Sequence, residues 1–553
     1  MKKSIWILFL IMILGISGVG AQLGSTIYVP SDYQSIQGAI DAAHSEDIII
    51  VSGGVYNESL NIQGKNNLTI RGSNNDGYPI INPSSVTDWN YFGYTNEKKT
   101  AIRIVESNNI TIENIVLDCD LVKDNGYSGI LYANSTGGVF SNNVFRNMSK
   151  SQYPNEDIMI YARADSPYTA VDRATLTLNY CDLYDTGKVA LSTNNYIDTS
   201  VDHCNFYKTT EAYGLGMEIF SNSSASITNS EFHGFNLNEN DNLPTAIYID
   251  NLGTQNENGV DKTVTIQNCE IYNCQVGIVA GNLFYFNNPN NNVGNVDIIL
   301  NIIDNNIHNN DLCGILMAEG YKSNGSSLHT TITGNSITVP VKNPDTIGVL
   351  AATNKNGDLS IYLQGNTISG YDIGLACINT EDNDDPDYSS FNISITNGNT
   401  FSNHSYGVGI VNINCPTPPI ISGNYFNHNK PVHFLKDDSI TLDLNTILAS
   451  NTFDHAKLAK NVIYGDGTVI YADAPKSLIK GNETQIYTVK ASYIEHLRSF
   501  TVRVQIPKAD FATEPANFTL GSSFNSPVMI TRGHTPDYWI FNVVELLWDP
   551  YLV

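Results

Sequence analysis

The pattern of apolar and polar residues repeats along the chain from residue 100 to residue 455. Each repeat contains an Asn, then any residue, then Ile or Phe, as in Asn305-Asn306-Ile307. Successive Asn residues are 30, 31, 33, 25 and 27 residues apart, at Asn305, Asn335, Asn366, Asn399, Asn424 and Asn451. A period of roughly 20–50 residues with small-residue turns predicts a solenoid, in which each repeat buries its apolar face against its neighbours.

The same column continues toward the N-terminus with mostly small or amide side chains. Its members there are Ile115, Asn143, Cys181, Cys204, Ser230 and Cys269. Stacked coils lie about 4.8 Å apart, so identical Asn side chains are expected to hydrogen-bond along the column as a ladder. We expect Cys181, Cys204 and Cys269 to be small buried residues of this column, with disulfides between them as the alternative.

A second column consists of Gly or Ala followed by an aliphatic residue. Its members are Gly129, Ala190, Gly216, Ala246, Gly277, Gly314, Gly348, Gly374 and Gly409. Such a position predicts a tight bend or a close backbone approach between stacked strands. The variable insertions Phe284–Gly294, Tyr321–His329 and Glu381–Ser390 lie between the two columns. Insertions confined to one part of each repeat map to one face of a solenoid, often the binding face.

Both ends of the chain depart from the repeat. Met1–Ala21 has two Lys, the apolar run Ile5–Ile16 and a small-residue end, which predicts a secretory signal peptide over residues 1–21. The apolar run is too short to span a membrane, and no later stretch qualifies, so we expect a secreted or cell-surface protein. We assign residues 461–480 to a linker and 481–553, where apolar and polar residues alternate, to a small β-sandwich-like domain that is complete or truncated.

The opening after the signal carries a family resemblance. The residues after the signal resemble the N-terminal cap found in members of the right-handed parallel β-helix superfamily, which has the pectin-lyase-like fold. That cap consists of a strand, a short amphipathic helix and a first coil, and the matching segments are Ile27–Pro30, Tyr33–Ala43 and Leu68–Gly72. The resemblance covers residues 25–460. It implies an all-β solenoid of about 12 coils, with a cap and first coil over 22–75 and the β-helix over 76–460. It does not imply one activity, because the superfamily holds lyases, hydrolases, esterases and adhesins.

Charge excludes one class of partner. The formal net charge is −26 and the pI is about 4.6, which argues against nucleic acid binding because phosphates are bound by clustered Lys and Arg. The same charge sets a mild long-range penalty on polyanionic ligands, which a local basic cleft can overcome.

Enzymes of this superfamily that cut uronic-acid polymers follow two catalytic patterns. Hydrolases use paired Asp residues as acid and base. In the hydrolase pattern an Asp pair is accompanied by Gly-His-Gly and Arg-x-Lys on consecutive coils. The chain has two Asp pairs without these motifs, Asp384-Asp385 and Asp437-Asp438, so we interpret both pairs as solvated loop charge.

Lyases use an Arg or Lys base with a cation that neutralises the substrate carboxylate. Val201-Asp202-His203 resembles part of a pectate lyase motif, and Arg163, Asp165, Asp172, Arg173 and Lys188 lie nearby in the sequence. The candidate catalytic residues are therefore Arg163, Lys188 and Asp202. The alternative is that Asp202 and His203 are turn residues before Cys204.

No cofactor is required by the sequence. Ca²⁺ is the one metal that the acidic run Glu381–Asp387 suggests, although that run lacks the spacing of an EF-hand loop. The single His residues His233, His308, His404 and His428 are expected in solvated turns.

Function follows from these observations as a hypothesis. Aromatic groups such as Tyr91–Tyr94 and Phe284–Phe286 offer sugar-stacking surfaces. Because no catalytic set is complete, we expect a carbohydrate-binding or adhesion module whose partner is a polysaccharide or cell-surface glycan. The alternative is a polysaccharide lyase or glycoside hydrolase acting on an acidic polysaccharide. The sequence does not indicate an oligomeric state.

Overall fold

The structure is a computed structural model of the 553-residue chain. It describes residues 24–453 except 84–86, 89–98, 123–126, 149–156, 166, 170, 210–213, 237–242, 251–259, 282–295, 320–326, 341–343, 354–356, 380–389, 405, 412–416, 428–445 and 448–449; toward the C-terminus it describes 462–465, 468–473, 488–492, 499–507, 528–534 and 538–546. Two compact units are present, the first of residues 1–432 and 437–454 and the second of 433–436 and 455–553. The expected signal peptide lies outside the described residues.

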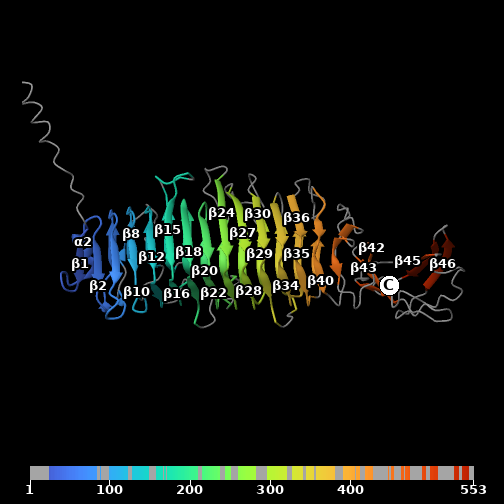
Figure 1. The fold of residues 1–553 in the computed structure, drawn as a ribbon, viewed down its shortest axis with the longest axis horizontal. Coiled ribbons are helices and arrows are strands. Elements are labelled where there is room, and N and C mark those ends of the chain that lie inside the picture. The colour runs from blue at the N-terminus through green and yellow to red at the C-terminus, as the bar shows by residue number, and fades with distance from the viewer. Residues whose placement is uncertain are drawn as a thin grey trace, which may run out of the picture. The chain divides into compact units, whose positions relative to one another are not determined.

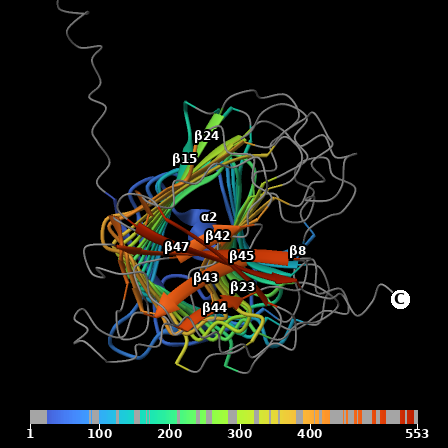
Figure 2. The same ribbon diagram turned by 90° about the vertical axis from the view of Figure 1, so that its right-hand side faces the viewer.

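The first unit is a right-handed parallel β-helix, as the sequence resemblance implied. Three long sheets, which we name A, B and C, run along it, and a coil contributes one strand to each (Figures 1 and 2). Sheet A holds β1 (Thr26–Val29), β2 (Ile48–Val51), β5 (Thr69–Gly72), β9 (Thr111–Glu113), β12 (Gly138–Ser141), β15 (Ala174–Asn179), β18 (Ile197–Asp202), β21 (Ser224–Thr228), β24 (Val260–Gln267), β27 (Val296–Ile303), β30 (Ser327–Thr333), β33 (Asp358–Gln364), β36 (Ser390–Thr396) and β39 (Ile420–Ser422).

Sheets B and C complete the coils. Sheet B holds β3 (Gly54–Tyr56), β6 (Pro79–Ile81), β10 (Val116–Asp118), β13 (Val144–Arg146), β16 (Asp182–Tyr184), β19 (Asn205–Tyr207), β22 (Glu231–His233), β25 (Glu270–Tyr272), β28 (Asn306–His308), β31 (Ser336–Thr338), β34 (Thr367–Ser369), β37 (Thr400–Ser402), β40 (Tyr425–Asn427) and β41 (Thr452–Phe453). Sheet C holds β4 (Leu60–Gln63), β8 (Lys99–Val105), β11 (Tyr127–Ala133), β14 (Ile158–Ala164), β17 (Val189–Asn195), β20 (Leu215–Ile219), β23 (Thr245–Ile249), β26 (Val276–Gly281), β29 (Cys313–Glu319), β32 (Ile347–Thr353), β35 (Ile373–Asn379) and β38 (Tyr406–Val411), with β7 (Thr87–Asp88) antiparallel to β8.

The turn from sheet A to sheet B contains the Asn ladder. In most coils two residues separate the strands, the first in the left-handed region and the second pointing into the interior. Asn335 Nδ2 donates to Asn366 Oδ1 at 3.0 Å, and Asn366 Nδ2 donates to Asn399 Oδ1 at 2.9 Å. The ladder runs unbroken from Asn305 to Asn451 and is confirmed. Cys181, Cys204 and Cys269 occupy the same column as buried free thiols.

The glycine column lies on the inner side of sheet C. A Cβ on Gly314 would meet the carbonyl oxygen of Gly348 at 2.7 Å, which confirms the close backbone approach. The column ends at Gly407 and not at Gly409, because Leu375 pairs with Val408 and sets Gly374 beside Gly407. The sequence analysis chose Gly409 because Gly407-Val408 and Gly409-Ile410 both match the pattern of Gly before an aliphatic residue, two positions apart.

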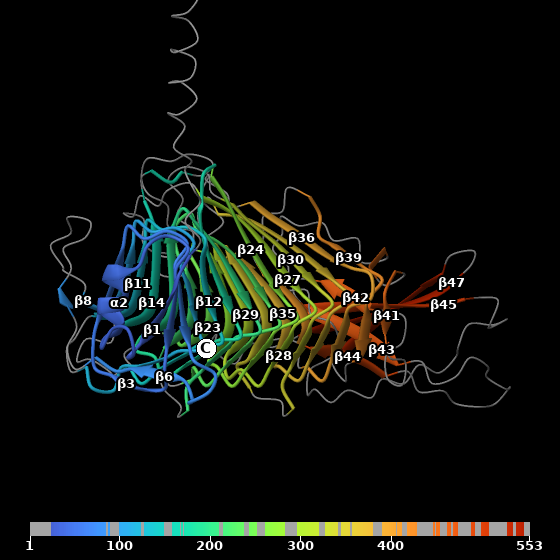
Figure 3. The ribbon, with the colours of Figure 1, turned by 60° about the vertical axis from the view of Figure 1, so that its left-hand side comes forward.

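The capping helix is also confirmed. Helix α2 (Ile36–Ala42) lies at the N-terminal end of the solenoid (Figure 3), with its apolar side chains buried. Ser35 Oγ accepts the Gly38 backbone N–H at 3.1 Å, and the Glu58 carboxylate accepts the N–H groups of Ile36 and Gln37. These bonds satisfy the otherwise unpaired donors of the first turn.

The second unit contains two antiparallel sheets of three strands. One is β42 (Val462–Gly465), β43 (Thr468–Asp473) and β44 (Thr488–Ser492); the other is β45 (Ser499–Pro507), β47 (Tyr538–Leu546) and β46 (Val528–His534). Strands β42 and β43 lie within 461–480, which the sequence analysis assigned to a linker. The sequence around Asp466-Gly467 carries β-branched and aromatic residues on both sides, a hairpin signal that outweighs the Pro and Gly content nearby.

Candidate functional site on the outer face of sheet C

Sheet C is the face beside which the coil length varies. The segments between Gly281 and Val296 and between Asn379 and Ser390 follow strands of sheet C, and the segment between Arg146 and Ile158 precedes one. The turns from sheet A to sheet B hold no such insertion in the described coils. Because long variable segments carry function on rigid scaffolds, the outer face of sheet C is where a ligand site is expected. The residues of the expected insertions lie largely outside the described part.

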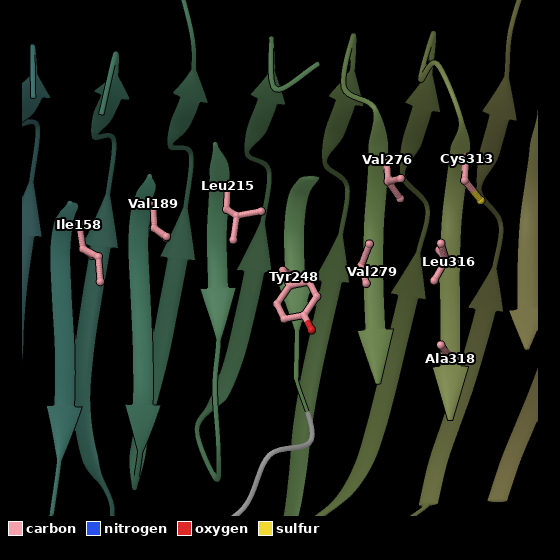
Figure 4. Packing of buried hydrophobic residues seen from close by; sticks show 9 residues of the cluster. All are labelled: Ile158, Val189, Leu215, Tyr248, Val276, Val279, Cys313, Leu316 and Ala318. Atoms are coloured by element: carbon pink, nitrogen blue, oxygen red, sulfur yellow. The ribbon is translucent and has the colours of Figure 1, made fainter. Parts of the chain in front are cut away.

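The outer face of sheet C carries a line of apolar side chains. Alternation along each strand sends one set of residues into the solenoid and the next set outward. The outward cluster is Ile158, Val189, Leu215, Tyr248, Val276, Val279, Cys313, Leu316 and Ala318 (Figure 4). All nine are buried, and Tyr161 and Phe220 pack against them. This face is therefore a second packed layer outside the solenoid core.

A polar patch interrupts this layer between β14 and β23. The register places Tyr161, Ser192, Glu218 and Tyr248 side by side on adjacent strands. Ser192 Oγ donates to Glu218 Oε2 at 2.9 Å, and Glu218 is buried. Burial raises the pKa of Tyr161, and the charges of Asp165 and Glu218 raise it further against the opposing effect of Arg163. The patch thus combines two tyrosines with hydrogen-bonded charged groups.

Arg163 extends the patch toward the turn into sheet A. Its Nε donates to Asp165 Oδ2 at 2.7 Å. Asp165 also accepts a hydrogen bond from Asn195 Nδ2, and its backbone N–H donates to Asn134 Oδ1 at 2.7 Å. These contacts fix both members of the ion pair, so Arg163 presents an oriented and largely neutralised charge.

Lys262 lies beneath the same corner. It is fully buried on β24, and its Nζ donates to the carbonyl oxygens of Ile219 and Asp250, which links the ends of β20 and β23. Burial lowers the pKa of Lys262 to about 7, although Asp250 and Glu218 act to raise it. The sequence analysis missed Lys262, Glu218 and Asp250. The detectable signal was Lys262 itself, which occupies an inward position between Val260 and Val264.

The three predicted catalytic residues are not brought together. Arg163 is at the corner between sheets C and A, Lys188 precedes β17 at the corner between B and C, and Asp202 ends β18 at the corner between A and B. Arg163 pairs in register with Asn194, so nearly the whole of β17, about 20 Å, separates it from the level of Lys188.

Asp202 has a local structural role. Its Oδ1 accepts hydrogen bonds from Thr228 Oγ1 at 2.6 Å and Asn229 Nδ2 at 2.8 Å, and its Oδ2 lies 2.8 Å from His203 Nδ1. Burial acts to raise the pKa of Asp202, but these hydrogen bonds hold it below its ordinary value. The alternative interpretation, that Asp202 is a turn residue, fits this arrangement.

The other expected site residues separate in the same way. Within the described residues, no group of three or more His, Cys, Asp or Glu is placed to hold a metal ion. Glu381–Asp387, Asp437-Asp438, Tyr91–Tyr94, Phe284–Phe286 and His428 lie outside them. His404 was expected in a solvated turn, but it is buried, with ring nitrogens 3.1 Å from Tyr371 O and 2.9 Å from Ile368 O. The chain turns inward there because Tyr371 is buried at the equivalent place in the preceding coil.

Comparisons with known proteins found matches among solved structures alone. No model of a protein family matches the chain, and no curated protein sequence does. Similar solved structures include the A-module of the Azotobacter vinelandii mannuronan C-5 epimerase (14% identity over 74% of this chain and 96% of that chain, TM-score 0.40) and a periplasmic alginate epimerase (13%, 71% and 84%, 0.35). Another is the tailspike protein gp49 from Pseudomonas phage LKA1 (10%, 93% and 89%, 0.39). The parallel β-helix is established by the three sheets of the chain itself. No helix in the described residues has the length and apolarity needed to cross a membrane.

Proposed function

We propose that this protein is an exported polysaccharide-binding β-helix, and that it binds on the outer face of sheet C between β14 and β23. The observation that carries the proposal is the row Tyr161, Ser192, Glu218 and Tyr248 beside the Arg163–Asp165 pair. Ser192, Glu218 and Tyr248 are buried and form the floor of the patch, whereas Tyr161, Arg163 and Asp165 are half-buried and would meet the ligand. An aromatic side chain beside a few fixed polar groups is typical of ligand sites, and sugars offer both apolar faces and hydroxyl groups to it.

Binding is favoured over catalysis by the state of the charged groups. Arg163 is paired with Asp165, Glu218 accepts from Ser192, and the Lys262 ammonium is engaged by two carbonyl oxygens. A general base must reach the proton that it abstracts, and a fully buried amine held by carbonyls does not. Both signs of charge are present, so the face suits a glycan recognised mainly through hydroxyl groups.

The test uses the full chain and a panel of neutral and acidic polysaccharides in affinity electrophoresis. We expect Tyr161→Ala and Arg163→Ala to weaken binding about tenfold each, which corresponds to about 1.4 kcal/mol. The matched control is Tyr362→Ala, at an exposed tyrosine of sheet A. Equal retardation of these variants and the wild type, with unchanged circular dichroism, would place the binding face elsewhere.

A lyase acting on an acidic polysaccharide is the second candidate, and the observation that favours it is Arg163, a predicted base that lies beside the sheet C patch. Lyases of this kind use an Arg or Lys base. Incubation with polygalacturonate and alginate, followed by ultraviolet absorbance of unsaturated products, distinguishes the candidates. Product formed by the wild type and abolished in an Arg163→Gln variant that still binds the polysaccharide would establish the lyase; depletion of ligand without product supports binding alone.

A further inference from the structure

The outer face of sheet B carries a continuous stack of aromatic rings. Each of five consecutive strands from β16 to β28 contributes its last residue, in the order Tyr184, Tyr207, His233, Tyr272 and His308. Neighbouring ring centroids are 4.9, 5.1, 4.8 and 5.0 Å apart, and the interplanar angles lie between 1° and 18°. Stacking fixes the three inner rings against two neighbours and each end ring against one, so the rings are ordered before any ligand arrives.

A second aromatic pair lies beside the start of these strands. Tyr180 and His203 stack at 4.9 Å and 23° in the turns before β16 and β19. Both have left-handed backbones, with φ of 53° and 50°. Other coils place Asn, Asp or Gly at this position, including Asn142, Asn229, Asn268, Asp304 and Gly334.

Tyr180 is not the residue that this turn favours. A bulky residue is disfavoured in the left-handed region, where Gly, Asn, Asp and His are the usual residues, so the conformational cost falls on Tyr180 and not on His203. Side chains that oppose the local backbone preference concentrate at functional sites. Tyr180 is 57% exposed and the His203 side chain 47%, so neither is held there by burial. Exposure at a conformational cost points to a ligand.

Polar groups fill the row between the two sets of rings. The first residues of the same five strands are Asp182, Asn205, Glu231, Glu270 and Asn306. Asn205 Nδ2 donates to Asp182 Oδ1 at 2.7 Å, Tyr272 Oη donates to Glu231 Oε1 at 2.5 Å, and His308 Nε2 lies 3.1 Å from Glu270 Oε1. In each carboxylate one oxygen is thus held in place. The other, Oδ2 of Asp182 or Oε2 of Glu231 and Glu270, has no hydrogen bond within the described residues. The Glu231 and Glu270 side chains are 37% and 51% exposed.

The charge of this face selects among ligands. Asp182, Glu231 and Glu270 form an acidic row, whereas Arg146, at one end of the stack, is paired with Asp118 at 2.8 Å and donates to Tyr184 Oη at 3.1 Å. Oriented carboxylate oxygens accept hydrogen bonds from hydroxyl groups, and their negative charge repels uronates and sulfates. Because each coil repeats the same row, the ligand that matches it is a polymer of repeated hydroxyl-bearing units.

We propose that this face is a second binding surface, for a neutral polysaccharide chain lying along the solenoid axis. We call it the sheet B platform; it comprises the two aromatic sets and the polar row between them. It lies on a different sheet from the proposed sheet C site and stands independently of it. Rings and carboxylates that are already ordered reduce the entropy lost on binding.

The turn residues provide a test that separates binding from folding. The double variant Tyr180→Asn and His203→Asn installs the residue that other coils use at this position, so its thermal stability should equal or exceed that of the wild type. Its affinity for laminarin, galactomannan or hydroxyethyl cellulose should fall at least tenfold in affinity electrophoresis with the full chain. Tyr207→Ala should produce a similar loss, and Tyr362→Ala on sheet A should produce none.

Ligand class is tested by charge. Glu231→Gln with Glu270→Gln should allow polygalacturonate to bind the platform, which the wild-type platform excludes. The proposal is overturned if no neutral polysaccharide binds the wild type or if the double Asn variant keeps its affinity. It is also overturned if the platform variants lose affinity for a cationic polymer and for no neutral polysaccharide. Arg163→Ala should leave unchanged the part of the binding that depends on Tyr180 and His203, and the double Asn variant should leave unchanged the part that depends on Arg163. Failure of the sheet C site and failure of the platform therefore give different results.

Discussion

Replacing Asn366 by Ala should destabilise the solenoid strongly, because its side chain is fully buried and fully bonded. Asn366 Nδ2 donates to Ile332 O at 2.7 Å and to Asn399 Oδ1 at 2.9 Å. Its Oδ1 accepts from the backbone N–H and from the Nδ2 of Asn335, at 2.9 and 3.0 Å. Truncation therefore leaves the buried Asn335 N–H without this acceptor and the Ile332 carbonyl without this donor.

The magnitude follows from those orphaned groups. Each buried group left without a partner costs about 1–3 kcal/mol, so the two together cost about 2–6 kcal/mol. Asn366→Ser should lose less, because Ser230 fills the same column with its Oγ accepting from Cys204 N at 3.1 Å and donating to Thr228 O at 2.7 Å. Thr367→Ala, one residue away and exposed, is the control and should cost under about 0.5 kcal/mol.

The assay is urea unfolding monitored by circular dichroism, combined with amide hydrogen exchange. Exchange is needed because repeat proteins open locally, and the protection of the Asn335 amide reports the affected coil directly. A loss below about 1 kcal/mol for Asn366→Ala, or equal protection of Asn335 in the variant and the wild type, would show that the ladder bonds do not stabilise the stack.

Two further predictions concern single positions. The pKa of Lys262 is about 7 in the folded protein and about 10.4 in an unfolded chain, so between these pH values the unfolded state binds more protons. The contribution of this group to the free energy of unfolding therefore rises with pH from about 7 to about 10. Lys262→Met should remove this rise, and a parallel pH–stability profile for both proteins would contradict the prediction. Gly314→Ala places a Cβ 2.7 Å from both Gly348 O and Ile337 Cγ2, and should lower the free energy of unfolding by about 1–3 kcal/mol in the same urea assay; an unchanged midpoint would mean that sheet C yields easily.

The sequence predicted the coil stack because its strongest constraint is periodic. Asn side chains that bond to each other across coils must recur once per coil, and the spacing of Asn335, Asn366 and Asn399 records that requirement directly. The helix α2 was predictable for a similar reason, since its buried residues follow helical spacing. The closeness of the predicted catalytic residues in the sequence did not show whether they are close in space. Arg163, Lys188 and Asp202 fall within two coils, yet each lies at a different corner.

Counting from the ladder would have shown this separation. Asp202 lies two residues before Cys204, which fixes it at the turn from sheet A to sheet B, whereas Lys188 follows Cys181 by seven residues and falls at the start of sheet C. The platform on sheet B was hidden for another reason. Tyr184, Tyr207 and Tyr272 are unremarkable alone, and only the register that aligns the ends of successive strands shows them as one stack.

The two-residue turn that most coils share between sheets A and B divides the molecule into a nearly constant part and a variable part. Because the ladder sets the register there, a segment that follows Gly281 or Asn379 can lengthen or shorten without shifting the ring spacing on sheet B. Loop exchange at sheet C is then a way to alter the proposed sheet C site while the proposed sheet B platform is retained. In engineering terms, the solenoid is a scaffold in which sheet C accepts grafted segments. The turn between sheets A and B meanwhile keeps the register of the strands.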